Sequence, residues 1–321
     1  MKEAICTIIT GNYGHYALAL HDSIAQFNPN LSFAVLVTES ALEPSILEAI
    51  QGREQFIVFY PKDFEPVTIA SQLHEKYFSA YHDAYRWGMK PVLMTRLLED
   101  GYERVIYADS DVYFFNDFSF LFDQLKASHV LLSPHWRCSD PLIDKQNFEL
   151  NFKDGIFNGG FVGASQLGVD ALAYWAKLCL FNCEVNRRDG YYVDQRYLDI
   201  LPTRFDKVAF IEHKGCNVGN WNQVDCERTL DAEGAVLING KYPIVFIHFS
   251  TKLLPGILKG HDTLLLPFLK LYRDNLLRYH AVDIIDRVLN GSNEIVARKD
   301  VSEDKKNHPK HYLARLLKKM K

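Results

Sequence analysis

The sequence of 321 residues lacks features that mark several classes of protein. It contains no run of about 18 apolar residues, so no segment is expected to cross a membrane as a helix. The apolar stretch at residues 5–10 is too short for a signal peptide and ends near Asn12 and Gly14. Lys and Arg (36) do not outnumber Asp and Glu (40), so no overall positive charge favours binding to nucleic acid.

Cysteine is also scarce, with six residues and no Cys-x-x-Cys pair. Cys179 and Cys183 are one helical turn apart, but no matching Cys or His pair follows them. We therefore interpret them as small buried residues of an amphipathic helix rather than zinc ligands. The pattern is typical of reduced thiols in a cytosol. Apolar residues make up 48% of the chain, which allows a large core without disulfides.

The first part of the chain alternates apolar strands with amphipathic helices. Strands are expected at residues 4–10, 33–37, 55–60 and 104–108, and helices at 15–27, 43–52 and before Gly101. This alternation predicts an α/β fold with a mostly parallel sheet covered on both faces. Ligands bind at the carboxyl ends of strands in such sheets, which indicates residues 10–14, 38–40 and 109–111.

The second part is less regular. A glycine-rich turn leading into a short strand is expected at 155–164, helices at 167–181 and 262–278, and a strand at 242–249. We expect a main domain at 1–260, a helical extension at 261–298 and a terminal segment at 299–321. Residues 311–321 have the pattern of a short basic amphipathic helix, which suits either peripheral membrane contact or packing against protein.

Asp109 and Asp111 give the strongest functional signal because they follow the apolar strand directly, in Tyr-Ala-Asp-Ser-Asp-Val. Two ionised carboxylates at the end of a buried strand repel each other, and a divalent cation between them removes the repulsion. His248 follows a second apolar strand and can complete the metal site. Mg²⁺ and Mn²⁺ bind such ligands and bridge phosphates. Taken singly, a solvated acidic turn or a core histidine would also explain these residues.

Three further features are more ambiguous. In Gly155-Ile156-Phe157-Asn158-Gly159-Gly160, the glycines allow a ligand to approach the backbone and the amide can bind hydroxyl groups, but a tight turn is the alternative. The polar segment 212–217 is either a ligand-binding loop or a surface loop. Trp136 and Trp221 can stack on an acceptor sugar, although packing is the more frequent role of tryptophan.

These motifs, in this order, resemble GT-A glycosyltransferases, especially glycosyltransferase family 8 and related bacterial nucleotide-diphospho-sugar transferases. The similarity extends over residues 4–255. It implies the GT-A fold, in which helices flank a Rossmann-like, mostly parallel central sheet, with a helical C-terminal extension here. In that family the Asp-x-Asp motif and the late His bind Mn²⁺, which implies Asp109, Asp111 and His248 as metal ligands.

The resemblance also implies other site residues. The implied catalytic pair beside the anomeric carbon is Asp194 and Gln195. The implied donor-binding residues are Thr10, Asn12, Tyr13, Glu39, Lys90, Asp109, Ser110, Asn158, Gly159 and Lys252. Lys90 is expected just before a helix, facing the donor phosphates or sugar. Family members commonly have Gly and Lys-Pro after the late His, whereas this chain continues Phe-Ser-Thr-Lys-Leu-Leu-Pro-Gly, so the subfamily stays open.

The implied activity is that of a retaining, hexosyltransferase-like enzyme dependent on Mn²⁺ or Mg²⁺. It would move a sugar from a nucleotide-diphosphate sugar, by resemblance a UDP-sugar, to a glycan or lipid-linked acceptor in bacterial cell-surface polysaccharide synthesis. The expected location is the cytoplasm, with peripheral contact at the inner face of the membrane through residues 311–321.

Three alternatives remain. A haloacid-dehalogenase-type phosphatase would use Asp109 as nucleophile and Asp111 as acid/base, but its motif normally opens the domain. A sugar-phosphate nucleotidyltransferase should open with a glycine-rich loop carrying Arg and Lys, which residues 10–16 do not. A GT-A protein that binds ligands without activity is the non-enzymatic alternative, and the complete Asp/Asp/His set argues against it.

Overall fold

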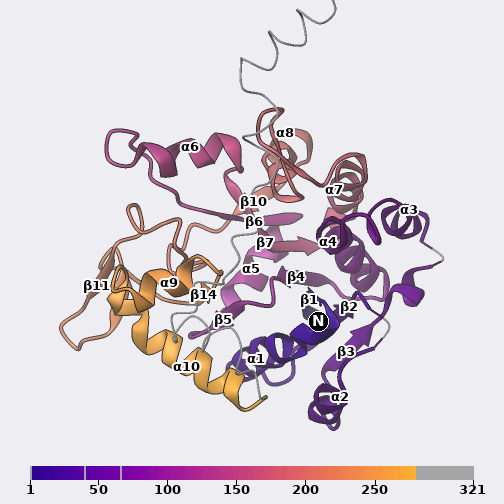
Figure 1. Cartoon of the computed structure of the whole chain (residues 1–321), viewed down its shortest axis with the longest axis horizontal. Helices are drawn as coiled ribbons and strands as arrows, with labels where there is room; N and C mark the ends of the chain where they lie inside the picture. The colour runs from indigo at the N-terminus through magenta and orange to yellow at the C-terminus, as the bar shows by residue number, and fades with distance from the viewer. Residues whose placement is uncertain (1, 40, 66, 280–321) are drawn as a thin grey trace, which may run out of the picture. The chain divides into compact units, whose positions relative to one another are not determined.

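The computed structural model describes residues 2–39, 41–65 and 67–279 (Figure 1). A seven-stranded sheet in the order β10-β6-β7-β4-β1-β2-β3 forms its centre. These strands are β1 (Glu3–Ile9), β2 (Ser32–Val37), β3 (Phe56–Phe59), β4 (Arg104–Ala108), β6 (Val130–Pro134), β7 (Phe157–Ser165) and β10 (Val208–Phe210). Among them only β7 runs antiparallel to its neighbours, β4 and β6. The predicted α/β class with a mostly parallel sheet is confirmed.

Helices cover both faces of this sheet, which explains why nearly all residues of its central strands are buried. Along β1, Ala4, Cys6 and Ile8 contact one apolar core, while Ile5 and Ile9 contact the other. The first core includes α3 (Thr68–Tyr77), α4 (His82–Glu99) and α7 (Val169–Phe181), and the second includes α1 (Gly14–Ala25), α2 (Pro44–Ile50) and α5 (Ser119–Ala127).

Shorter elements connect and extend this arrangement. Three small sheets are formed by β5 (Val112–Phe114) with β14 (Phe246–His248), by β8 (Val185–Asn186) with β9 (Tyr191–Tyr192), and by β11 (Arg228–Leu230), β12 (Val236–Ile238) and β13 (Tyr242–Pro243). The remaining helices are η1 (Gly11–Tyr13), η2 (Pro61–Phe64), α6 (Lys145–Lys153), η3 (Gln166–Gly168), η4 (Gln195–Ile200), α8 (Leu201–Arg204), α9 (Leu253–Leu258), η5 (Thr263–Leu265) and α10 (Leu266–Leu277). The last of these packs against α1, where Asn275 Nδ2 donates to Asp22 Oδ2 at 3.4 Å.

Three local predictions were wrong. The expected strand at 242–249 is two strands in different sheets, because β13 pairs with β12 while β14 pairs with β5. Asn158, Gly159 and Gly160 lie inside β7 rather than in a turn, because the two glycines leave room above the strand for side chains from other elements, such as those of Asp194 and His248. Lys90 lies within α4 rather than before a helix, although Gly88 and Pro91 are unfavourable in a helix interior.

Other predictions fall on parts of the chain that the structure does not describe. The basic helix at 311–321 and residues 280–298 of the predicted extension lie outside the described residues. The domain boundaries at 260 and 298 stay predictions. All six cysteines are buried and free. Among the described helices, none combines the length and apolar character needed to cross a membrane.

Candidate functional site

Three neighbouring parallel strands, β1, β2 and β4, end at one edge of the sheet with polar residues. Thr10 follows β1, and the backbone N–H of Gly11 donates to a carboxylate oxygen of Glu39, which comes after β2. Asp109 follows β4, the strand on the other side of β1. Tyr13 lies in η1 and stacks on Tyr16, while of Asn12 only the backbone in η1 is described. The topology thus brings the predicted strand-end positions together.

A separate two-stranded ladder brings His248 to the two aspartates. In the β5–β14 pair, His248 lies opposite Val112, and the N–H of Phe249 donates to Asp111 O at 2.8 Å. His248 Nε2 therefore lies 3.0 Å from Asp111 Oδ1 and 3.9 Å from Asp109 Oδ2. One ligand atom from each of the three side chains lies within 4.8 Å of the others. Such a cluster can hold a metal ion.

The electrostatics of this cluster fit a divalent cation. Burial would raise the pKa of Asp109, but Lys90 and His248 outweigh burial and lower it, so the carboxyl group is ionised. Burial would lower the pKa of His248, but Asp111 and then Asp109 outweigh it and raise that pKa. A cation among these groups would take over the balancing of the two carboxylates. Carboxylate oxygens and an imidazole nitrogen suit Mn²⁺, and the carboxylates suit Mg²⁺.

Gly160 on β7 permits this convergence. A Cβ at this position would lie 2.5 Å from Asp109 Oδ2, 2.6 Å from His248 Cε1 and 2.9 Å from Asn158 Oδ1. The backbone is fixed as well, because Asp109 N–H donates to Gly160 O and Gly160 N–H donates to Asn158 Oδ1, at 2.8 and 2.7 Å. Only glycine leaves room for the three side chains to meet over the strand.

Lys90 is the buried cation of the site, with 3% of its surface exposed. Its Nζ lies 3.3 Å from Asp109 Oδ1 and 3.2 Å from Asp194 Oδ2, and it donates to Gly159 O at 2.9 Å. Burial would lower the pKa of Lys90, but Asp109 and Asp194 outweigh it and raise the pKa. Lys90 is therefore protonated, and its ammonium group lies between the candidate metal ligand Asp109 and the predicted catalytic residue Asp194.

Asp194 and Gln195 face the strand that carries Asn158, Gly159 and Gly160. The Asp194 carbonyl accepts from Trp175 Nε1 at 2.9 Å, which fixes the backbone there. Burial and then the charge of Asp109 raise the pKa of Asp194 to about 6, although Lys90 lowers it. Gln195 uses both ends of its amide, since Oε1 accepts from Gly159 N–H at 3.2 Å and Nε2 donates to Asp154 O at 2.8 Å. Asp194 is therefore the ionisable group here.

One cavity of about 340 Å³ joins many of these residues. The predicted residues that line it are Lys90, Asp109, Asn158, Gly159, Asp194, Gln195, His248 and Lys252. The lining does not include Thr10, Tyr13, Glu39, Ser110 or Asp111, which lie toward the strand-end edge. Asp111 nevertheless lies beside the cavity, because its ligand atom is within 4.8 Å of those of Asp109 and His248, which line it.

The cavity also contains residues that the sequence analysis missed, among them Trp87, His135, Arg137 and Tyr192. His135 and Arg137 follow β6 just as Asp109 follows β4, so the same strand-end signal could have found them. Burial, followed by the charge of Arg137, holds the pKa of His135 well below its usual value. No sequence pattern distinguishes Trp87 or Tyr192 from the other aromatic residues of the chain.

The structure distinguishes between the residues whose roles the sequence left open. Trp221 lines the cavity and packs edge-to-face against His248 at 5.2 Å between ring centroids. Trp136 does not line it, and Lys214 Nζ lies 5.0 Å from the centre of its ring. From the polar segment 212–217, Asn217 reaches the site, where its Oδ1 accepts from Asn158 Nδ2 at 3.2 Å.

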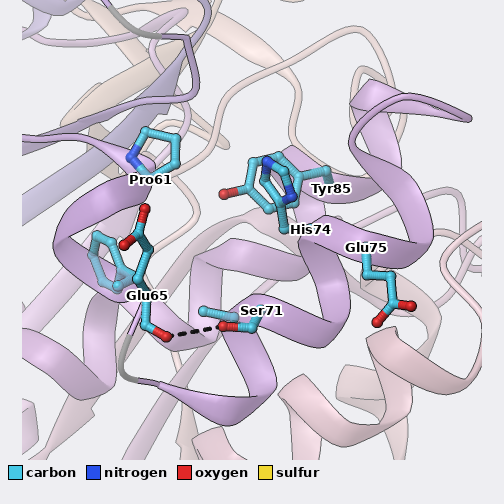
Figure 2. A pocket seen from close by; sticks show the side chains of 8 residues that line it. Pro61, Glu65, Ser71, His74, Glu75 and Tyr85 are labelled. Carbon is cyan, nitrogen blue, oxygen red and sulfur yellow. Dashed lines mark hydrogen bonds between the residues drawn. The ribbon is translucent and has the colours of Figure 1, made fainter.

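A smaller cavity of about 190 Å³ lies between η2 and α3 and has fewer charged groups that could bind a ligand (Figure 2). Its polar groups contact one another: Ser71 Oγ donates to Glu65 O at 3.0 Å, and the rings of His74 and Tyr85 lie edge-to-face at 5.5 Å. No Lys or Arg lines it, so it is poorly suited to phosphate. The larger cavity is the better candidate for a functional site.

Comparisons with known proteins give relatives of limited similarity. No protein-family model matches this chain. The uncharacterized protein YfnF of Bacillus subtilis (strain 168) is 28% identical over 256 residues, 78% of this chain and 82% of YfnF. The uncharacterized protein YfnD of the same strain is 29% identical over 202 residues, 58% of this chain and 62% of YfnD.

Similar solved structures include the galactosyltransferase LgtC in complex with donor and acceptor sugar analogs. At 17% identity and a TM-score of 0.46, the match covers 77% of this chain and 86% of LgtC. Mouse xyloside xylosyltransferase 1 is 12% identical with a TM-score of 0.49, covering 79% of this chain and 99% of that one. Both of these proteins are glycosyltransferases.

Proposed function

We propose that this chain is a metal-dependent glycosyltransferase that moves a sugar, with retention of anomeric configuration, from a UDP-sugar to a glycan or lipid-linked acceptor. The observation that carries the proposal is the convergence of Asp109, Asp111 and His248 ligand atoms within 4.8 Å, beside a cavity that also contains Lys90 and Asp194. A departing nucleoside diphosphate gains negative charge, and a metal ion held by these ligands would offset that charge. Synthesis of bacterial cell-surface polysaccharide is the proposed setting.

In this proposal the two groups of residues bind different parts of the donor. Asp109, Asp111 and His248 hold Mn²⁺ or Mg²⁺, which would offset the charge of the leaving diphosphate. The strand-end edge with Thr10 and Glu39 faces the nucleoside. Lys252, a cavity residue, supplies a second positive charge toward the diphosphate.

The sugar occupies the cavity between the metal ligands and Asp194. Asn158 and the Gly159 backbone bind its hydroxyl groups, and Asp194 stabilises the positive charge that develops at the anomeric carbon. The bond from that carbon to the diphosphate oxygen breaks, a bond to the acceptor oxygen forms, and the acceptor proton passes to solvent. Because the Gln195 amide already bonds Gly159 and Asp154, Gln195 positions the strand while Asp194 faces the sugar.

Calorimetric titration tests this function. UDP and a panel of UDP-sugars would be added with Mn²⁺ or with chelator to the wild type, to Asp111→Ala and to the control Asp123→Ala, which removes an exposed carboxylate on α5. We expect metal-dependent binding of a UDP-sugar by the wild type and the control, weakened at least about tenfold in Asp111→Ala.

The opposite results are equally clear. Absence of nucleotide binding to the wild type would exclude the transferase, and phosphatase activity dependent on Asp109 would then be measured. Once donor and acceptor are known, NMR of the product reads the linkage, and an inverted anomeric configuration would exclude retention.

A further inference from the structure

Two groups of charged residues in and beside the large cavity favour opposite kinds of ligand. In the first group, which we call the metal end, the carboxylates of Asp109, Asp111 and Asp194 outnumber the lysine that pairs with them, Lys90, so an added cation is favoured there. The balance is reversed around Arg137, which lines the cavity together with Asp154, and we refer to this part of the lining as the far end. An added anion would be favoured at that end.

Three guanidinium groups share two carboxylates around the far end, where Arg137 and Asp154 are the two that line the cavity. Arg187 occupies both oxygens of Asp154, at 2.7 and 3.2 Å, and Arg196 pairs with Asp199. Arg137 Nη2 lies 3.9 Å from the already occupied Asp154. One positive charge is therefore left without a carboxylate of its own among the described residues of this cluster.

Arg137 carries this excess charge inside the cavity wall, with 7% of its surface exposed. Its Nη1 donates to the carbonyls of Gly155 and Leu150, at 2.5 and 3.2 Å, while its Nε has no hydrogen-bond partner in the described part of the chain. Burial lowers the pKa of Arg137 to about 10 despite the attraction of Asp154. A buried and weakly neutralised cation is costly, and a bound anion removes that cost.

Outside this end of the cavity, large apolar side chains are exposed on and beside α6. Leu142, Ile143, Phe152 and Ile156 are 93%, 69%, 65% and 50% exposed, and we refer to these four as the α6 ridge. No residue of α6 is buried. In Figure 1 this helix stands apart from α4 and α7, which cover the sheet. Core packing therefore does not explain these residues, and such patches are typical of binding surfaces.

Helix α6 contributes to both the ridge and the cavity wall. Leu150 on α6 lines the cavity, as does Val185, and the Leu150 carbonyl accepts from Arg137. A ligand that leaves the cavity at this end therefore passes from a buried cation onto exposed apolar side chains. An anionic group joined to an apolar chain matches both.

We propose that the acceptor is a sugar borne on an anionic lipid, with its phosphate bound by Arg137 and its apolar chain lying on the α6 ridge. The proposal rests on the proposed function, because the acceptor hydroxyl must then face Asp194 and the donor sugar. It narrows the acceptor from glycans in general to a short sugar close to a lipid phosphate.

Calorimetry with three soluble probes, in the presence of chelator, separates the parts of this ligand. Octyl phosphate has both the anion and the chain, inorganic phosphate the anion alone, and octyl glucoside a chain without charge. The full-length wild type would be compared with Arg137→Gln, Arg137→Lys and the double variant Leu142→Ser/Ile143→Ser. Two variants are matched controls: Arg188→Gln removes an exposed guanidinium that is not in the cavity, and Leu167→Ser removes an apolar side chain that is 71% exposed elsewhere.

We expect the wild type and both controls to bind octyl phosphate more tightly than either other probe. Arg137→Gln should weaken the binding of octyl phosphate on the order of tenfold, to the affinity seen for octyl glucoside. Arg137→Lys should have an affinity for octyl phosphate between those of the wild type and Arg137→Gln. The double serine variant should bind octyl phosphate only as tightly as it binds inorganic phosphate.

Several outcomes would overturn the proposal. Equal affinities for octyl phosphate and inorganic phosphate would mean that the site binds a free anion rather than a lipid phosphate. Unchanged affinity for octyl phosphate in Arg137→Gln would mean that Arg137 does not bind the anion. A change of oligomeric state in the double variant, seen by light scattering, would make the ridge a contact between copies. Mn²⁺ binding by each variant reports that it is folded, and absence of Mn²⁺ binding in the wild type would reject the proposed function separately.

Discussion

Replacing Gly160 by alanine perturbs the centre of the site with a single methyl group. Its Cβ would lie 2.5 Å from Asp109 Oδ2 and 2.6 Å from His248 Cε1, where unstrained contacts are about 3.5 Å. The backbone cannot retreat easily, because Gly160 O accepts from Asp109 N–H at 2.8 Å within the ladder. The Asp109 and His248 side chains must therefore each move by about 1 Å or turn to other rotamers.

A displacement of this size has a measurable effect on metal affinity. Changes that misorient metal ligands cost about tenfold to a hundredfold in affinity, which corresponds to about 1.4–2.7 kcal/mol. Mn²⁺ alone is a sufficient probe, because the signal of free Mn²⁺ in electron paramagnetic resonance is lost on binding. Titration of the wild type and Gly160→Ala gives the two affinities directly, without knowledge of the donor.

Gly163→Ala is the matched control, since it places the same methyl group on the same strand but away from the site. Its Cβ would meet Leu125 Cδ1 at 3.0 Å and Leu131 Cβ at 3.3 Å, both in the apolar core. We expect Gly163→Ala to lower the melting temperature and leave Mn²⁺ affinity unchanged. Wild-type Mn²⁺ affinity in Gly160→Ala would refute the reasoning, because the ion could not then lie between Asp109 and His248.

Three further predictions follow from the charges of the site. Mn²⁺ at about 100 times its dissociation constant should stabilise the fold by about 2.7 kcal/mol, and a melting curve of His248→Ala that shifts as much as the wild type would contradict this. Because the folded-state pKa of Asp194 is raised to about 6, its contribution to stability is complete below about pH 4 and is lost as the pH rises to about 6. Chemical denaturation of the wild type should therefore show a fall of about 3 kcal/mol in unfolding free energy over this pH range, and Asp194→Asn should not show it. The same pH dependence in the variant as in the wild type would refute this reasoning. Lys90→Met should lower the unfolding free energy by about 3 kcal/mol because it leaves buried carboxylates unpaired. A double-mutant cycle with Asp194→Asn tests this, since additive effects of the two substitutions would show that the two residues do not interact.

The sequence predicted the sheet because its signals are local. Continuous apolar runs at β1, β2 and β4, separated by amphipathic helices, can be stable only as central strands covered on both faces, and they formed that sheet. The same reasoning failed at 242–249, where the apolar run extends across two strands. Which partner each half takes depends on β5 and β12, and these are distant in the chain.

For the site, the residues that stand at strand ends could be proposed from the sequence, whereas the contacts between them could not. Asp109, Asp111 and His248 each follow an apolar strand, and the three positions taken together indicate a role in binding. The charge of Lys90, however, is explained only by its approach to Asp109 and Asp194, which come from different elements. A buried lysine inside a helix shows no sequence period that distinguishes it.

The sequence by itself therefore determined the fold class and the chemical character of the Asp109/Asp111/His248 cluster, because periodicity and the order of residues along a strand are properties of the chain. Tertiary structure alone decided the convergence at Gly160, the charge of the far end around Arg137 and the exposure of the α6 ridge. Each of these depends on distances between segments that fold together from separate parts of the sequence, and such distances are set by packing.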